Sequence, residues 1–111
     1  MKLYTKVLTS IFFSLLSFIV CAEDFTVVNV GLSNNSNSIF IRVQEEFPHG
    51  CSVPQNIKTF VWSIDNVLYK EIYSTALTAL ATGKKLNISY GTSSTDCINN
   101  HPTTKSLFIK N

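Results

Sequence analysis

The sequence predicts a mainly β domain with one helix, built as a small five-stranded barrel and stabilised by one disulfide. Five short segments have the alternation or the β-branched composition of strands, and one stretch between them changes to a helical period. Two cysteines remain in the part of the chain that is expected to be exported. With 111 residues, 45% of them hydrophobic and 14% charged, the chain is long enough for one domain and too apolar for intrinsic disorder.

Residues 1–22 are predicted to be a secretory signal peptide. Lys2 and Lys6 make its start positive, and residues 11–20 form an apolar run that only two serines interrupt. This run is about half as long as the roughly 20 apolar residues that a membrane-spanning helix requires. We therefore expect an exported protein without a membrane span.

The end of this segment sets the boundary of the mature domain. Ala22 supplies the small residue that signal peptidases require, so cleavage is expected before Glu23 and the domain comprises residues 23–111. A lipoprotein signal with Cys21 as the lipidated residue is the alternative. In either case the sequence predicts a secreted or periplasmic location.

The charge of the chain changes when the signal is removed. The formal net charge of the whole sequence is +2, and the two lysines of the signal account for it. The seven basic and seven acidic residues of the mature part cancel. A neutral domain has no long-range attraction for polyanions, so we expect no nucleic-acid partner.

Cys51 and Cys97 are expected to form a disulfide, because an even pair of cysteines in an exported protein is usually oxidised. Closing this loop stabilises a small domain by roughly 4 kcal/mol in the chain-entropy model. Together with His49 and His101 the two thiols would also make a tetrahedral zinc set, which is the alternative. The spacings are not those of zinc fingers, and an oxidising compartment favours the disulfide. We expect neither a metal nor another cofactor.

Three strands are predicted in the first half of the mature chain. Residues 24–32 are rich in β-branched and aromatic residues, and residues 39–44 and 57–63 alternate apolar with polar side chains. The Asn- and Ser-rich residues 33–38 predict a turn between the first two strands. Residues 45–55 contain two prolines and a glycine and are expected to form a loop.

One helix of about 16–17 residues is predicted after the third strand. Asp65 or Asn66 can cap its start, and Gly83 can end it in the left-handed conformation. The apolar stripe recurs every fourth residue, at Leu68, Ile72, Ala76 and Leu80. The outward face is expected to be small and uncharged, with Thr75, Thr78, Ala79 and Thr82. Such a face suits packing against another chain, and equally a plain surface helix.

Two further strands are expected at residues 85–90 and 104–110, separated by a polar loop at residues 91–103. Three strands, one helix and two strands is the element order of the OB-fold, a small Greek-key barrel. We therefore predict an OB-like five-stranded barrel. An α+β sandwich with the helix on an antiparallel sheet is the alternative.

Catalysis finds little support, and we expect the protein not to be an enzyme. The sequence has no nucleophile elbow, no zinc-protease motif and no phosphate-binding glycine loop. His49 and His101 lie beside prolines and are expected to be solvated loop residues. Glu45 and Glu46 are adjacent, so as strand residues they would point to opposite faces.

Part of the chain resembles the B subunits of AB5 toxins of the subtilase-cytotoxin and pertussis-like type. The resemblance lies in Val61-Trp62, Tyr73-x-x-Ala76-Leu77, Thr82-Gly83 and Leu86-x-Ile88-x-Tyr90. It implies an OB-fold, a pentameric ring, a companion A subunit and binding of sialylated or related glycans.

The resemblance also implies two glycan-binding residues. Tyr90 matches a strand-end tyrosine of the sugar pocket, and Thr26 matches a sugar-contacting serine of the first strand. Tyr90 shares a strand face with Leu86 and Ile88, so its ring belongs either to the core or to a pocket. Trp62, the only tryptophan, is expected to be a core residue.

We therefore expect a secreted, non-catalytic binding protein that takes a glycan. The polar residues 34–38 and 92–100 supply hydroxyl and amide groups of the kind that hold sugars. The alternative is a small secreted or periplasmic interaction or inhibitor domain without a sugar site.

Overall fold

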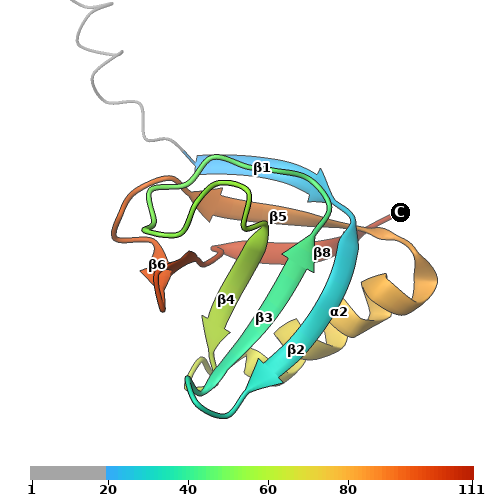
Figure 1. Ribbon diagram of the computed structural model, residues 1–111. Coiled ribbons are helices and arrows are strands. Elements are labelled where there is room, and N and C mark those ends of the chain that lie inside the picture. Colours follow the sequence, from blue (N-terminus) through green and yellow to red (C-terminus); the bar gives the residue numbers. More distant parts are fainter. Residues whose placement is uncertain (1–19) are drawn as a thin grey trace, which may run out of the picture.

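The computed structural model describes residues 20–111, which form two three-stranded antiparallel sheets, a short hairpin and one helix (Figure 1). The first sheet has the order β1-β5-β8, with β1 at Val20–Phe25, β5 at Lys85–Gly91 and β8 at Ser106–Lys110. The second has the order β2-β3-β4, with β2 at Val27–Ser33, β3 at Ser38–Val43 and β4 at Thr59–Ser63. The hairpin joins β6, Cys97–Ile98, to β7, His101–Pro102, and the helix is α2, Tyr69–Thr82. A mainly β domain with one helix is therefore confirmed.

Most of the predicted signal peptide, residues 1–19, lies outside the described residues. The described part of the chain begins with Val20 inside β1, three residues before the expected cleavage site. Cys21 pairs with Tyr90 of β5 in this ladder, so cleavage before Glu23 would remove the residue opposite Tyr90. Within residues 20–111, no helix combines the length and the apolar character needed to cross a membrane.

The predicted first strand is two strands, because the chain bends at Thr26 and passes from one sheet to the other. The backbone N–H of Thr26 donates to Oε1 of Glu45 at 2.8 Å, and its hydroxyl donates to Oε2 at 2.9 Å. The register also shifts between Val27 and Asn29, and a bulge of this kind increases strand bending. The Glu45 carboxylate thus replaces the ladder hydrogen bonds that the bend interrupts.

The prediction of a closed, five-stranded barrel is wrong in strand number and in closure. Residues 20–111 contain eight strands, because the first is divided and the expected loop at 91–103 holds β6 and β7. The described strands β4 and β8 are not hydrogen-bonded to each other, so the two sheets stay separate. The helix α2 packs against both β2 and β8 and spans the two sheets (Figure 1).

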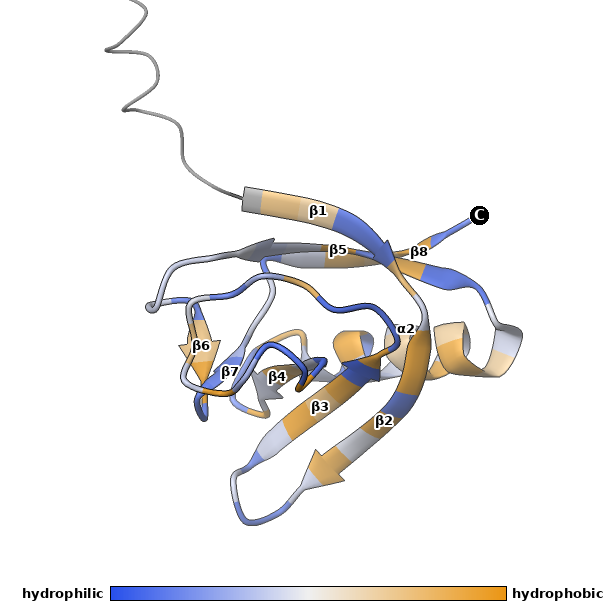
Figure 2. Cartoon of the chain, turned by 45° about the horizontal axis from the view of Figure 1, so that its top comes forward, coloured by the Kyte–Doolittle hydropathy of each residue, from blue (hydrophilic) through white to orange (hydrophobic). Residues whose placement is uncertain are grey.

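An aromatic cluster fills the space between the sheets. Phe47 stacks on Phe60 with ring centroids 4.1 Å apart, and Phe25 meets both rings edge-on at 5.4 Å. Trp62 is also buried, as expected. Hydrophobic residues mark β2, β3 and the helix in Figure 2, whereas the connecting turns are hydrophilic. Phe47 comes from the loop at 45–55, so an irregular segment supplies a central ring of the core.

The helix begins later than expected and ends where expected. It has 14 residues, and Asn66 forms the turn before it, its side chain accepting from the Leu68 N–H at 2.9 Å. Gly83 follows the last turn with φ of 71°, and its N–H donates to the carbonyl of Ala79. The left-handed glycine end is therefore confirmed.

The buried face of α2 differs from the predicted stripe. Ile72, Ala76 and Ala79 are buried, whereas Leu80 is 40% exposed. A row of every fourth residue drifts by about 40° at each step around a helix of 3.6 residues per turn. Leu80 has consequently rotated off the face that Ile72 occupies, and Ala79 replaces it. The expectation that Ala79 faces outward is wrong.

The disulfide between Cys51 and Cys97 is confirmed, with their Cα atoms 5.8 Å apart. It joins the loop at 45–55 to the start of β6. Gly50 lies against the backbone of Thr92 and Ser94, where a Cβ atom would have no room. Because the two sulfurs bond to each other, the zinc alternative loses both of its thiolate ligands.

Replacing Cys51 and Cys97 together by alanine should lower the free energy of unfolding by about 4 kcal/mol, because the loop-closure entropy returns to the unfolded chain. Urea unfolding of the variant and of the wild type measures this change. The reduced wild-type protein is the matched control and should unfold at the same urea concentration as the variant. A variant as stable as the oxidised wild type would contradict the prediction.

Candidate functional site

The two residues expected to bind a glycan lie at opposite ends of β1. Tyr90 pairs with Cys21 near the start of this strand, and Thr26 directly follows its last residue, Phe25. Five residues of extended chain separate their backbones by about 16 Å. The structure therefore does not bring Tyr90 and Thr26 into one pocket.

The side chain of Tyr90 belongs to the core. It is fully buried, and its ring lies 5.2 Å from Phe47 and 5.6 Å from Phe60. Its hydroxyl is buried without a hydrogen-bond partner among the described residues. Burial, and then the negative charge of Glu23, raise the pKa of the Tyr90 phenol. A ring enclosed in this way has no free face for a sugar.

The hydroxyl of Thr26 is occupied by its hydrogen bond to Glu45. Lys85 also lies near this carboxylate, with its Nζ 3.8 Å from Oε2. Burial by itself would raise the pKa of Glu45, but the two hydrogen bonds from Thr26 and the charge of Lys85 hold that pKa below its ordinary value. Thr26 and Glu45 therefore hold the bend between the sheets.

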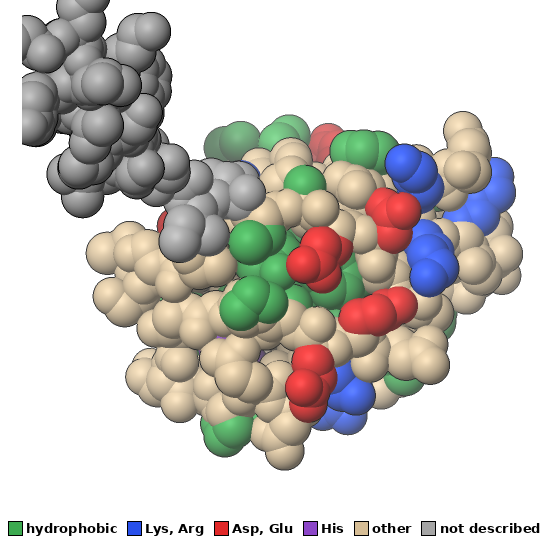
Figure 3. All heavy atoms as spheres, turned by 90° about the horizontal axis from the view of Figure 1, so that it is seen from above, with side chains coloured by type: hydrophobic (Ala, Val, Ile, Leu, Met, Phe, Trp, Pro, Cys, Tyr) green, Lys and Arg blue, Asp and Glu red, His purple; other side chains and the backbone are tan. Residues whose placement is uncertain are grey.

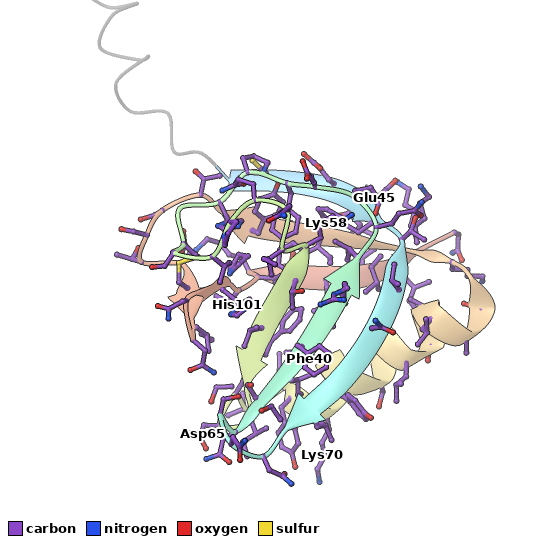
Figure 4. The ribbon with its side chains drawn as sticks, in the orientation of Figure 1. Phe40, Glu45, Lys58, Asp65, Lys70 and His101 are labelled. Atoms are coloured by element: carbon purple, nitrogen blue, oxygen red, sulfur yellow. A yellow bond between two sulfur atoms is a disulfide. The ribbon has the colours of Figure 1, made fainter. Side chains whose placement is uncertain are left out.

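A groove lies on the outer face of the second sheet, away from the core. Strand alternation turns Ser38, Phe40 and Arg42 of β3 to this side, and their partners Val61 and Thr59 on β4 turn with them. The hairpin β6–β7 lies beside the sheet and adds Asn99 and His101; Figure 4 labels His101 and Phe40 on this side. The groove has a volume of about 310 Å³, and its lining consists of Ser33, Ser36, Ser38, Phe40, Arg42, Ile57, Thr59, Val61, Asn99 and His101.

Phe40 provides an aromatic surface in the groove. It pairs with Gly31 of β2, and a Cβ atom on that glycine would collide with the tip of the phenyl ring. The absent side chain thus lets the ring lie close over the β2 backbone. The hydroxyls of Ser36 and Ser38 lie at one end of the groove and hydrogen-bond each other at 2.6 Å. The groove therefore combines one ring with several small polar groups.

The hairpin beside the groove has a defined conformation. Asn99 and Asn100 both have positive φ, 52° and 66°, which is the pattern of a type I′ turn. Nδ1 of His101 lies 2.7 Å from the carbonyl oxygen of Asn99 and must donate to it, because a carbonyl only accepts. The Val53 N–H donates to the carbonyl of Asn100 at 3.3 Å. In neutral His101 the other ring nitrogen, Nε2, is then an acceptor.

Sequence reasoning missed this hairpin and the groove. Residues 91–103 were expected to be a loop, although Asn99 and Asn100 are residues that tolerate the left-handed backbone of a two-residue hairpin turn. The groove itself gives no such signal, because its residues come from β2, β3, β4 and the hairpin.

The groove is positive in character. None of the described acidic residues lines it, and Arg42 has no ion-pair partner among residues 20–111. Glu45 and Asp96 pair instead with Lys85 and Lys105. Acidic side chains are visible on the β1 side of the molecule, which Figure 3 shows and which is not the side of the groove.

His49 is buried, at 9% exposure, so the expectation of a solvated loop residue is wrong for it. Its Nδ1 accepts from the Cys51 N–H at 3.1 Å, and Gln55 bonds both its backbone N–H and its carbonyl. Burial and the nearby charge of His101 lower the pKa of His49. His49 therefore supports the disulfide-linked loop from within.

No protein-family model matches the chain, and no curated protein and no solved structure is significantly similar to it. The site must therefore be interpreted from its chemistry. Within residues 20–111, no cluster of three or more His, Cys, Asp and Glu side chains could hold a metal ion. The groove offers a ring, hydroxyls, an amide, an imidazole and a guanidinium, which can bind a polar ligand through several hydrogen bonds.

Tyr90→Ala should lower the free energy of unfolding by about 3–5 kcal/mol, because it opens a cavity among the aromatic rings. Tyr90→Phe is the matched control, and it should be neutral or stabilising because it removes a buried hydroxyl without a partner. Chemical denaturation of both variants measures the difference. An intact, equally stable Tyr90→Ala protein would show that the ring does not support the core.

The protein should lose stability as the pH falls below about 6.5, the ordinary pKa of histidine. The folded state depresses the pKa of His49, so the unfolded chain binds a proton that the folded chain does not, and acid favours unfolding in this window. Denaturant midpoints between about pH 7.5 and about pH 5 measure the effect. His49→Gln should flatten the dependence and His101→Gln should largely keep it; an unchanged profile in His49→Gln would refute the assignment.

Proposed function

We propose that this protein is a secreted, non-catalytic carbohydrate-binding protein, similar in kind to the B subunits of AB5 toxins, and that its ligand lies in the groove beside Phe40. The observation that carries the proposal is the combination of an aromatic ring with hydroxyl, amide and imidazole groups in one groove. Apolar faces of sugar rings pack on aromatic side chains, and sugar hydroxyls pair with such polar groups. The volume of about 310 Å³ lies at the lower end for small-molecule sites, so the groove would hold a short part of a glycan.

The connectivity supports an open OB-like fold. The bent first strand takes part in both sheets, β2, β3 and β4 follow one another, α2 comes next, and β5 returns to pair with β1. OB-folds bind oligosaccharides and oligonucleotides on the face of their second and third strands, between two loops. Here those strands are β3 and β4, and the groove lies on their outer face next to the hairpin.

A protein-interaction domain without a sugar site is the second candidate. Val67 is 91% exposed, and Ile64 and Leu68 beside it are also exposed. These residues connect β4 to α2, and Leu68 lines a hollow of about 280 Å³ that continues to Leu107 of β8. Exposed apolar groups next to a hollow are typical of protein interfaces. A partner subunit or a second copy of the chain would use this region.

The helix surface is compatible with assembly into a ring. The hydroxyls of Thr78 and Thr82 donate to the backbone carbonyls four residues earlier, at 2.8 and 2.7 Å. Their polar groups are thus satisfied within the helix, and a small, uncharged surface remains for a neighbour. A pentamer and a companion A subunit are part of the proposal on this basis and on the sequence resemblance.

A glycan array with the purified protein should show binding, and Phe40→Ala should weaken it by about tenfold, because the sugar loses its aromatic contact. Gly31→Ala should also weaken binding, since the new methyl group displaces the Phe40 ring. Phe108→Ala is the matched control, because this ring is 52% exposed on β8 of the other sheet. A silent array with folded wild-type protein, or equal losses in all three variants, would count against the site.

A further inference from the structure

A second hollow continues the groove along the same face of the sheet. It has a volume of about 360 Å³, and its lining consists of Val28, Arg42, Val43, Gln44, Asn56, Ile57 and Lys58. Arg42 and Ile57 line both hollows, so the two form one continuous surface. We call this surface the extended groove.

Two cations lie along the extended groove without compensating acids. Neither Arg42 nor Lys58 forms an ion pair among the described residues, and no described Asp or Glu lines either hollow. The acidic residues nearest to Arg42 in the sequence are Glu45 and Glu46, which follow β3. Glu45 accepts hydrogen bonds from Thr26, and neither residue lines the two hollows. Figure 4 shows Lys58 and Glu45 at the same end of the molecule, where the Glu45 carboxylate accepts two hydrogen bonds from Thr26 at the bend. The charges of Arg42 and Lys58 are therefore available to a ligand.

We infer that the extended groove binds an acidic polysaccharide, one whose repeating units carry sulfate or carboxylate groups. This inference rests on the proposed carbohydrate-binding function and names the class of glycan. The planar guanidinium of Arg42 matches the paired oxygens of a sulfate or carboxylate group. The ammonium of Lys58 attracts a second anionic group further along the chain. Phe40 and the hydroxyls of the groove contact the sugar unit next to Arg42.

The surroundings favour a polysaccharide over a nucleic acid. Among the residues that line the two hollows, Phe40 is the only Phe, Tyr or Trp. Proteins that bind single-stranded nucleic acids stack several bases on several aromatic side chains. The predicted mature chain also has no net charge, so it lacks the broad positive field of nucleic-acid-binding domains. Two local cations beside hydroxyl and amide groups match a sugar chain with spaced charges.

The test compares short oligosaccharides of equal length by calorimetry with the purified full chain. The probes are a sulfated heparin fragment, its desulfated form, a hyaluronan fragment that carries carboxylates only, and a neutral glucan. At least one acidic probe should bind ten or more times more tightly than the neutral one, with an affinity that falls as salt is added. The sulfated and the carboxylate-only probes tell which acidic group is preferred.

Arg42→Gln and Lys58→Gln should each lower the affinity for the preferred acidic probe by about tenfold, and the double variant should lower it further. Lys110→Gln is the matched control, because it removes the same charge from an exposed position at the end of β8. It should leave the affinity unchanged. An equal loss in Lys110→Gln would show unspecific attraction by net charge and overturn the inference.

The remaining outcomes separate this inference from the proposed function. If neutral and acidic probes bind alike and Phe40→Ala still weakens both, the carbohydrate site stands and its acidic specificity fails. If no glycan binds the folded protein, both fail. A short single-stranded oligonucleotide serves as a further probe. If it binds more tightly than every glycan and loses affinity in Arg42→Gln, the surface is a nucleic-acid site, and the inference is wrong.

Discussion

The bond between Cys51 and Cys97 holds two irregular segments against opposite sides of one sheet. On the inner side, the loop at 45–55 places Phe47 on Phe60 in the centre of the core. On the outer side, β6 leads into the hairpin that carries His101 beside the groove. A domain of this size buries little apolar surface, so neither segment would be well ordered by packing alone. The covalent link thus couples the stability of the core to the shape of the groove.

The bend at Thr26 is the second constraint on the shape. A strand shared by two sheets must interrupt its own ladder, and the interrupted N–H needs another acceptor. Glu45 supplies it, and these hydrogen bonds together with the charge of Lys85 hold the pKa of the carboxyl below its ordinary value, although burial acts in the opposite direction. The same contact holds the Glu45 carboxylate at the bend, and Glu45 does not line the groove.

The groove is a surface built from ordinary sheet positions. Side chains that alternate away from the core would be simple surface residues on a flat, open sheet. Here the absent side chain at Gly31 and the hairpin that ends in Asn99 and His101 make that face concave. Concavity brings a ring, hydroxyls and Arg42 within reach of one ligand.

The local features could be predicted from the sequence: the helix and its glycine end, most of the strands, and the disulfide. Each depends on residues close in the chain, or on cysteine count, and so leaves a readable pattern. The division of the first strand and the burial of Tyr90 depended on contacts with distant residues. The groove was decided only by tertiary structure, because its side chains come from three strands and a hairpin. Whether a residue of an alternating strand faces the core or a ligand depends on what packs against that face of the sheet. The local sequence of the strand does not contain this information.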